Sequence, residues 1–409
     1  MNLKKSKYII LKQICKVIPP NLVSNLAKKY EVDKQSRKFT PWSHVVTMLF
    51  AQLAHSLSLN DVADTMSAHT GTLSTIRDAY PPTRNNLSHA NKIRNADMAE
   101  ELFWKTLEHL QDISGTFGFG KKYSGIPKGF KKAIYAIDST TIQLVANCID
   151  WAKHRRQKAA AKCHMSLNLQ TFLPNFAIVK TAASSDAVEA ESLCSGLKAG
   201  EIAVFDKAYV DFKHLYSLNQ RDVFWVTRAK SNMKYKTVGQ HSAPKGNVYT
   251  DDLIELTIEK SKNLYSNKLR LVEADVMIDG KKKRLTFITN NLLWSAGSVC
   301  DLYKSRWGVE VFFKQIKQTL QLADFLGQSE NAVRWQIWTA LLTYLLLRYV
   351  GHMAKWTGSF SRLFTLLRGT LWSRLDISDL IESYGTANDP PRTVASATQI
   401  YFPGISLVT

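Results

Sequence analysis

Three acidic residues, Asp138, Asp206 and Glu310, are candidates for catalysis because of their positions in the sequence. Asp138 ends the apolar run "AIYAID", Asp206 ends a second run, "IAVFD", and Glu310 lies in a segment with helical spacing. In open α/β sheets, ligands bind beyond the carboxyl ends of the strands, so two strand ends and a facing helix could bring the three carboxylates together. Carboxylates are ligands that Mg2+ prefers, and two such ions can drive phosphodiester cleavage. The alternative is that each aspartate caps a turn.

A stripe of polar residues accompanies Glu310 in "LYKSRWGVEVFFKQIK", residues 302–317. Spacings of three, four and seven residues place Tyr303, Arg306, Glu310 and Lys317 within about 60° of one another on a helix. Cationic and phenolic side chains beside a carboxylate could bind the phosphates of a substrate. The alternative is a solvated helix face with a weak Arg306–Glu310 ion pair.

Five further basic residues are candidates for DNA contact because they lie close to the strands that carry the aspartates. They are Arg228, Lys230, Lys153, Arg155 and Arg156. The first two end a strand-like segment, and the other three belong to the basic run "DWAKHRRQKAAAKCH" that follows the Asp138 strand. Such a run is often only a solvated loop. His164, at the end of the run, could ligate a metal, for which its strand position is the only support, and a hydrogen-bonded polar histidine is the favoured alternative.

The composition indicates a folded protein with a polyanionic partner. The chain has 409 residues, 45% of them hydrophobic, and 54 Lys and Arg against 34 Asp and Glu give a formal charge of +20. This balance points to nucleic acid. Five scattered cysteines without CxxC spacing argue against a disulfide framework and a zinc site. No apolar run is long enough to span a bilayer and no secretion signal is evident, so we expect a cytoplasmic protein without a membrane partner.

The hydrophobic patterns predict an α/β protein with helices first. Helical spacing fills residues 40–113, strands and helices alternate from about residue 131, and short alternating segments fill residues 231–295. A plausible N-cap at Ser58 or Asn60 and Pro41 near a helix start support the first part. The expected domains are a helical N-terminal DNA-binding domain (1–125), a catalytic core in two parts (126–230 and 296–350), a β-rich insertion (231–295) and a C-terminal helical region and tail (351–409).

The motifs together resemble those of a known family, the DDE transposases of bacterial insertion sequences. The resemblance is closest to the insertion-sequence-four group, whose signature is Tyr, two residues, Arg, three residues, Glu, six residues, Lys. "YKSRWGVEVFFKQIK" matches it at every position, "AIDST" resembles the first-aspartate motif, and "FDKAYVDF" resembles the second. The likeness covers roughly residues 130–350, and residues 20–115 look like the N-terminal domain of one branch of the group.

The resemblance implies an RNase H-like catalytic core in which Asp138, Asp206 and Glu310 bind Mg2+ or Mn2+, as two ions. It also implies cut-and-paste movement, double-stranded DNA partners at the element ends and at the target, a homodimer in the synaptic complex, and association with the bacterial nucleoid. Two alternatives stay open: an RNase H-like nuclease without strand transfer, and an inactive DNA-binding relative. The second motif departs from the usual Asp-Arg-Gly-Tyr because it reads Asp206-Lys207-Ala208-Tyr209.

Overall fold

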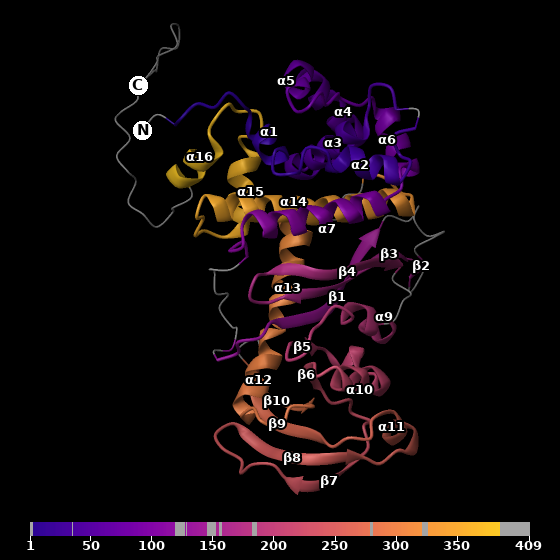
Figure 1. The fold of residues 1–409 in the computed structure, drawn as a ribbon, viewed down its shortest axis with the longest axis vertical. Coiled ribbons are helices and arrows are strands. Elements are labelled where there is room, and N and C mark those ends of the chain that lie inside the picture. The colour runs from indigo at the N-terminus through magenta and orange to yellow at the C-terminus, as the bar shows by residue number, and fades with distance from the viewer. Residues whose placement is uncertain are drawn as a thin grey trace, which may run out of the picture. The chain divides into compact units, whose positions relative to one another are not determined.

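The computed structural model describes residues 3–34, 36–118, 127, 129–144, 153–154, 158–181, 186–278, 281–320 and 326–384. The chain divides into two compact units. One comprises residues 1–18 and 346–409, and the other comprises residues 19–345. Figure 1 shows the elements of both.

The larger unit begins with helices, as the sequence predicts for residues 40–113. They are α2 (Leu22–Lys29), α3 (Pro41–Ala54), α4 (Leu59–Ala68), α5 (Thr70–Ser74), α6 (Arg84–Ile93) and α7 (Asp97–Ile113). Pro41 occupies the first turn of α3, where its missing N–H is not needed. Ser58, not Asn60, is the N-cap of α4, and it forms a reciprocal capping box with Asp61.

One large mixed sheet follows the helices. Its strands are β1 (Ile134–Leu144), β2 (Lys153–His154), β3 (Lys158–Asn168), β4 (Leu173–Thr181), β5 (Ile202–Phe205), β6 (Phe224–Arg228), β7 (Tyr235–Gln240), β8 (Val248–Leu256), β9 (Leu269–Ile278) and β10 (Lys281–Thr289). The spatial order is β2-β3-β1-β5-β6-β10-β9-β8-β7, and β4 pairs with β3. The pairs β1–β5 and β5–β6 are parallel, whereas the other pairs are antiparallel. The fold is therefore a mixed α/β fold with a large sheet.

The alternating segments of residues 231–295 do form strands, and these strands extend the same sheet. β10 pairs with β6 through Phe287 opposite Arg228, and β9, β8 and β7 follow it outward. Helix α11 (Glu259–Leu264) connects β8 to β9. A buried ion pair joins the outer strands, because Arg270 on β9 donates two hydrogen bonds to the carboxylate of Asp251 on β8 at 2.7 and 2.8 Å.

Helices cover both faces of the sheet near β1, β5 and β6 (Figure 1). On one face, α9 (Asp186–Leu193) and α10 (Phe212–Gln220) bury apolar side chains against Tyr135, Ile137, Ala203 and Phe205. On the other face lie α12 (Ala296–Ser305) and α13 (Trp307–Lys314), followed by a π-helical turn (Gln315–Thr319). The predicted apolar band of this segment is confirmed as buried: Leu302, Val309, Phe312, Phe313, Ile316 and Leu320.

The smaller unit joins the two ends of the chain. It contains α1 (Ile10–Cys15), α15 (Phe360–Arg368) and α16 (Ile377–Ser383), and the long helix α14 (Glu330–Met353) contributes residues to both units. Backbone bonds link the ends, with Ser6 N donating to Arg374 O at 3.0 Å and Ile10 N to Ser373 O at 3.1 Å. Within the described part of the chain, no helix combines the length and the apolar character that crossing a membrane requires.

Candidate active site

The register of two parallel strands brings Asp138 and Asp206 to one place. Ile137 on β1 is paired with Phe205 on β5, and each aspartate is the next residue of its strand or strand end. Neighbouring strands lie about 4.8 Å apart. The sequence predicts Asp138 at a strand end, whereas β1 continues to Leu144 because it stays paired with β3. Asp138 is thus the point where the pairing of β1 with β5 stops.

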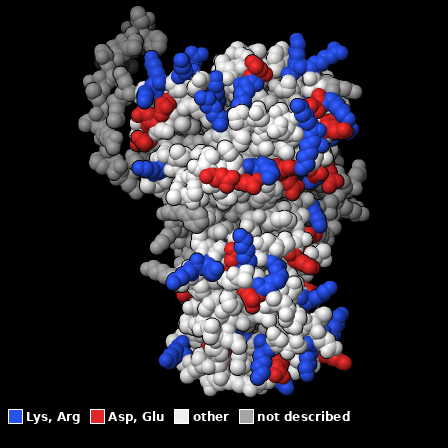
Figure 2. All heavy atoms as spheres, in the orientation of Figure 1, with Lys and Arg blue, Asp and Glu red and all other residues white. Residues whose placement is uncertain are grey.

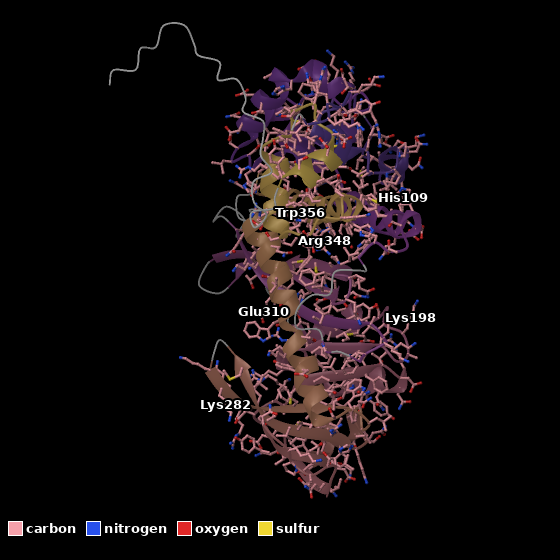
Figure 3. The ribbon with its side chains drawn as sticks, turned by 90° about the vertical axis from the view of Figure 1, so that its left-hand side faces the viewer. His109, Lys198, Lys282, Glu310, Arg348 and Trp356 are labelled. Atoms are coloured by element: carbon pink, nitrogen blue, oxygen red, sulfur yellow. The ribbon has the colours of Figure 1, made fainter. Side chains whose placement is uncertain are left out.

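Side-chain alternation decides which way Asp138 points. Ile137 belongs to the buried cluster that α9 and α10 cover, so the next residue of the strand faces the side where α12 and α13 lie. The contacts agree, because Arg306 reaches Asp138 from the junction between these two helices. Figure 3 shows Glu310 on the same helical segment, in α13.

Arg306 links two of the three carboxylates. Its Nη1 lies 2.5 Å from Asp138 Oδ2 and its Nη2 lies 2.7 Å from Glu310 Oε1. The Arg306–Glu310 ion pair of the alternative interpretation is present, but Arg306 is only 7% exposed, so this part of the stripe is not a fully solvated face. Tyr303 completes the group by donating its hydroxyl to Asp206 Oδ2 at 3.2 Å. Two residues of the signature thereby contact all three acidic residues.

The three carboxylates act on one another electrostatically. Burial raises the pKa of Asp138 above its ordinary value, Arg306 opposes the rise, and the charges of Glu310 and Asp206 add to it. Burial on its own lowers the pKa of Arg306, but Asp138 and the neighbouring groups more than reverse this and hold the guanidinium charged. Burial also raises the pKa of the Tyr303 phenol, which therefore stays a donor at neutral pH.

The donor chemistry of the site fits a divalent cation. Among the described residues, no three His, Cys, Asp or Glu side chains stand at the mutual spacing of a metal site. A cationic guanidinium lies between two of the carboxylates, those of Asp138 and Glu310. Carboxylate oxygens are the hard ligands that Mg2+ and Mn2+ take. A divalent ion would use the same oxygens once Arg306 turns away from them.

Comparison with known proteins identifies the family. The family described as "Transposase DDE domain" matches residues 129–346, which is just over half of the chain and includes the whole site. The chain belongs to the DDE transposases. The resemblance inferred from the motifs is therefore confirmed. A second family, a domain of unknown function (DUF4372), matches residues 6–76 of this transposase.

Individual relatives agree with the family. This transposase is 28% identical, over 55% of its chain and 59% of the relative, to a Geobacillus stearothermophilus protein named as the transposase of insertion sequence element IS5377. It is 31% identical, over 59% of its chain and 67% of the relative, to the y4zB protein of Sinorhizobium fredii, also named as a transposase. Transposase InsG of insertion sequence element IS4 from Escherichia coli is 26% identical over 46% and 42% of the two chains. The alignment thus spans less than two thirds of the first of these relatives.

One solved structure overlaps most of the transposase at a low level of similarity. It is a piggyBac transposase synaptic complex with hairpin DNA, which matches at a TM-score of 0.45 and 10% identity over 91% of this chain and 83% of that one.

Lys317 lies further along β1 than the other residues of the stripe. Its Nζ donates to the carbonyl oxygen of Thr141 at 2.6 Å, and burial lowers the pKa of its ammonium group. The separation arises because the segment is not one uniform helix: α12 ends at Ser305, and Lys317 sits in the π-helical turn after α13. The sequence periodicity gives no sign of either irregularity.

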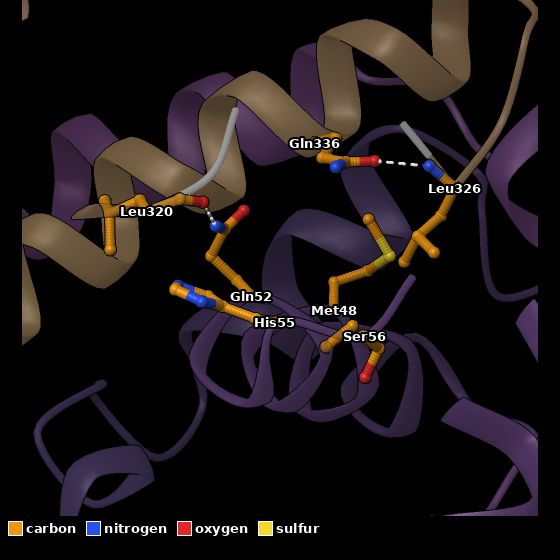
Figure 4. A pocket seen from close by; sticks show the side chains of 8 residues that line it. Met48, Gln52, His55, Ser56, Leu320, Leu326 and Gln336 are labelled. Carbon is orange, nitrogen blue, oxygen red and sulfur yellow. Dashed lines mark hydrogen bonds between the residues drawn. The ribbon is translucent and has the colours of Figure 1, made fainter. Parts of the chain in front are cut away.

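The turn that carries Lys317 ends against the N-terminal helices of the transposase, in a small pocket shown in Figure 4. Gln52 Nε2 donates to Leu320 O, and His55 Nε2 lies 2.9 Å from Thr319 O. Both side chains come from the end of α3, where His55 takes the left-handed conformation with φ 57°. They bind carbonyls that a helix end leaves without intrahelical donors. No pattern in the sequence indicates this contact.

The remaining basic candidates differ in what the structure describes. Arg228 lies close enough to Tyr303 to act on the pKa of its phenol, and Lys230 Nζ donates to Val210 O at 2.8 Å, just after the second motif. The backbone of Lys153 pairs in β2 with β3, and nothing is described of its side chain. Arg155 and Arg156 lie outside the described residues.

The altered second motif folds without strain. Lys207–Tyr209 form a 3-10 turn, and Asp206 caps it by accepting a bond from Ala208 N at 3.2 Å. Ala208 is not among the described residues with positive φ, so the turn does not need a glycine at this position. The replacement of the usual glycine by alanine therefore leaves the placement of Asp206 intact.

Proposed function

We propose that the chain is the transposase of its own insertion sequence. It binds the terminal inverted repeats of the element, cleaves the DNA at its ends and joins the free 3′-OH to target DNA in a cut-and-paste reaction. Asp138, Asp206 and Glu310 are the catalytic residues and the ligands of Mg2+ or Mn2+, as two ions. The observation that supports this most directly is that Tyr303 and Arg306 contact all three carboxylates in one site.

The residues around the site have distinct tasks in this proposal. Divalent ions held by the carboxylates would activate the attacking water or 3′-OH and stabilise the leaving oxygen. Arg306, once released from Asp138 and Glu310, presents a fork of donors suited to a phosphate. Tyr303 donates a hydrogen bond, and Lys317, Arg228 and Lys230 add positive charge along the DNA. Lys153, Arg155 and Arg156 extend this contact beyond β1.

The strand arrangement supports an RNase H-like core. β4, β3 and β1 are consecutive antiparallel neighbours, β5 and β6 continue in parallel with β1, and the first aspartate lies on β1 in the middle. In this proposal residues 126–230 and 296–350 form the core, residues 231–295 are an insertion that prolongs its sheet, residues 1–125 form the N-terminal helical domain, and residues 351–409 form the C-terminal region.

Helix α6 is the part of the N-terminal domain best suited to contact DNA. Apart from Ile93, its exposed side chains are donors or acceptors without a carboxylate: Arg84, Asn85, Asn86, Ser88, His89 and Lys92. Such side chains contact phosphates and base edges. Helix α7 instead carries several acidic residues, and a band of red side chains crosses the molecule at its level in Figure 2. Two copies of the chain, each holding one end, form the synaptic homodimer of this proposal.

Purified full-length protein tests the function with DNA that carries the ends flanking its gene. We expect Mg2+-dependent cleavage at the ends and joining of a pre-cleaved 3′-OH end to a second DNA. Asp138→Asn, Asp206→Asn and Glu310→Gln should each abolish both steps, as should a chelator. Cleavage that survives any one substitution would refute the role of that residue. Cleavage without joining would favour the nuclease alternative.

A further inference from the structure

A second polar cluster lies on the opposite face of the sheet from Arg306, centred on Asp186 at the start of α9. Asp186 Oδ1 accepts a hydrogen bond from Ser139 Oγ at 2.8 Å and pairs with Lys162 Nζ at 2.8 Å. It also lies 3.5 Å from His164 Nδ1. Ser139 and His164 are direct partners in the β1–β3 register, and Lys162 is two residues from His164, so all three face α9.

The cluster touches both aspartate motifs. Ser139 follows Asp138, and its backbone N–H donates to Asp138 Oδ1 at 2.8 Å. On the other side, the hydroxyl of Tyr209 lies 3.4 Å from His164 Nδ1, and Tyr209 closes the turn that Asp206 begins. The Asp186 carboxylate therefore bonds Ser139, the neighbour of Asp138, directly, and it is linked to Tyr209 of the second motif through His164.

The cluster is partly buried, with Asp186 and Lys162 about one fifth exposed or less, and the charge states of His164 and Asp186 follow from their surroundings. His164 is fully buried, which lowers its pKa to about 4, so the ring is neutral at pH 7. Burial would raise the pKa of Asp186, but Lys162 and Ser139 hold it below its ordinary range, and the group stays ionised. Asp186 is thus a fixed negative charge whose nearest cation is Lys162. A network of hydrogen bonds between polar side chains holds those side chains in one conformation when its bonds are made.

We propose that Asp186 is a positioning residue for the metal-binding carboxylates, acting through Ser139 on Asp138 and through His164 and Tyr209 on Asp206. This inference rests on the proposed function of those carboxylates. Groups that orient metal ligands in this way typically change metal affinity or activity by about 10- to 100-fold when they are removed. A purely structural ion pair between α9 and β3 would alter stability and leave metal affinity unchanged.

The same helix offers a matched control. Glu189 lies three residues after Asp186 on α9, its side chain is 3% exposed, and it pairs with Lys180 Nζ at 2.8 Å. Lys180 belongs to β4, which is separated from β1 by β3. Glu189→Gln therefore removes one carboxylate charge and one Lys–carboxylate pair from the same helix, as Asp186→Asn does, but from a pair with the outer strand.

The test measures the Mn2+ dissociation constant of the full-length protein by titration, with the melting temperature of each variant beside it. We expect Asp186→Asn to raise the dissociation constant about 10-fold or more, and Glu189→Gln to leave it within about twofold of the parent. Ser139→Ala should weaken Mn2+ binding in the same direction, and Ser139→Thr, which keeps the hydroxyl, should restore it. The serine variants keep the inference testable if Asp186→Asn does not fold.

Two outcomes would overturn the inference, and they are distinguishable. If Mn2+ binding requires Asp138 but is equal in Asp186→Asn and Glu189→Gln, or in Ser139→Ala and the parent, Asp186 is only structural. If Asp138→Asn binds Mn2+ as the parent does, the carboxylate site itself is refuted, and the positioning role falls with it.

Discussion

Arg306 uses two nitrogens of one planar guanidinium to bond two carboxylates. Nη1 serves Asp138 on the sheet and Nη2 serves Glu310 one helical turn away. The residue therefore neutralises charges that would otherwise repel each other in a buried site, and it occupies the place between the acids. A metal ion could therefore bind these carboxylates only if Arg306 moved away from them, and a released Arg306 would be free to bind a phosphate.

Replacing Arg306 by Lys tests this dual contact. A lysine has one compact ammonium in place of two separated guanidinium nitrogens and cannot reproduce both bonds in this geometry, so Arg306→Lys should lower stability by about 1–3 kcal/mol and reduce cleavage at least 10-fold. Thermal unfolding and a cleavage assay measure the two effects. Arg334→Lys is the control, because Arg334 also pairs with two carboxylates, Asp97 and Glu100, away from the site. Equal cleavage by the two variants would contradict the role of Arg306.

At the scale of elements, the site depends on how closely α13 approaches the sheet. Gly308, between Arg306 and Glu310, has no side chain where a Cβ would come within 2.7 Å of Leu169 Cδ2 and 3.6 Å of Phe172. Leu169 and Phe172 are themselves buried, so they have little room to move. The absence of a side chain at this position lets α13 approach the sheet closely enough for Arg306 to bond Asp138 while it also pairs with Glu310.

Gly308→Ala should therefore harm activity more than stability. Alanine favours a helix by about 1 kcal/mol over glycine, which partly offsets an overpacking cost of about 1–3 kcal/mol, while α13 is displaced from the sheet. We expect a small fall in melting temperature and a fall in cleavage rate of at least 10-fold. Gly297→Ala, in the first turn of α12 where only Ser295 Oγ lies within 4 Å, should be neutral or stabilising and fully active. Normal cleavage by Gly308→Ala would refute the close-approach argument.

The sequence could predict part of the site, because apolar runs and a helical period are local patterns. The burial of Phe312 and Leu320, the cap at Ser58 and the position of Arg306 and Glu310 one helical turn apart follow from such patterns, whereas the continuation of β1 past Asp138 depends on its pairing with β3. The π-helical turn and the link between α3 and Thr319 depend on tertiary contacts, and no local pattern records them. The Asp186 cluster is predictable only in part. The sequence shows a serine after Asp138 and an aspartate at the start of a helix, but it does not show that the two side chains bond each other.

The whole larger unit should lose stability as the pH falls. Burial lowers the pKa of His44 to about 3 and those of His164 and His214 to about 4, against about 6.5 in the unfolded chain. Below about pH 6.5 the unfolded state binds protons that the folded state does not, so each histidine removes about 1.4 kcal/mol per pH unit until its folded pKa is reached. Thermal unfolding between pH 8 and pH 5 measures this slope.

A substitution at His214 distinguishes the contribution of the buried histidines to acid destabilisation from the contribution of all other titrating groups. His214 is 7% exposed, and its Nε2 has no hydrogen-bond partner in the described part of the chain. His214→Leu should leave the melting temperature at pH 8 unchanged or raised, because no bond of that nitrogen is lost, and it should make the pH dependence shallower by about a third. The exposed His89→Gln is the control and should follow the parent. A parallel shift of the whole profile would contradict the argument.

The molecule as a whole carries a formal charge of +20, although its candidate active site is acidic. Because basic residues would supply the DNA affinity and the carboxylates the cleavage, a substitution at a carboxylate should abolish cleavage without weakening DNA binding. Asp138→Asn should bind end DNA as tightly as the parent or more tightly, because it removes a negative charge near the phosphates while the cations that supply affinity remain. Titration with labelled end DNA at several salt concentrations gives the affinity and its salt slope.

On α6, Arg84→Gln and Lys92→Gln should each reduce the salt slope of DNA binding by about one phosphate contact. Lys105→Gln, whose ammonium pairs with Glu108 on α7, should leave the slope unchanged, and if all three variants behaved alike, α6 would not be the DNA face.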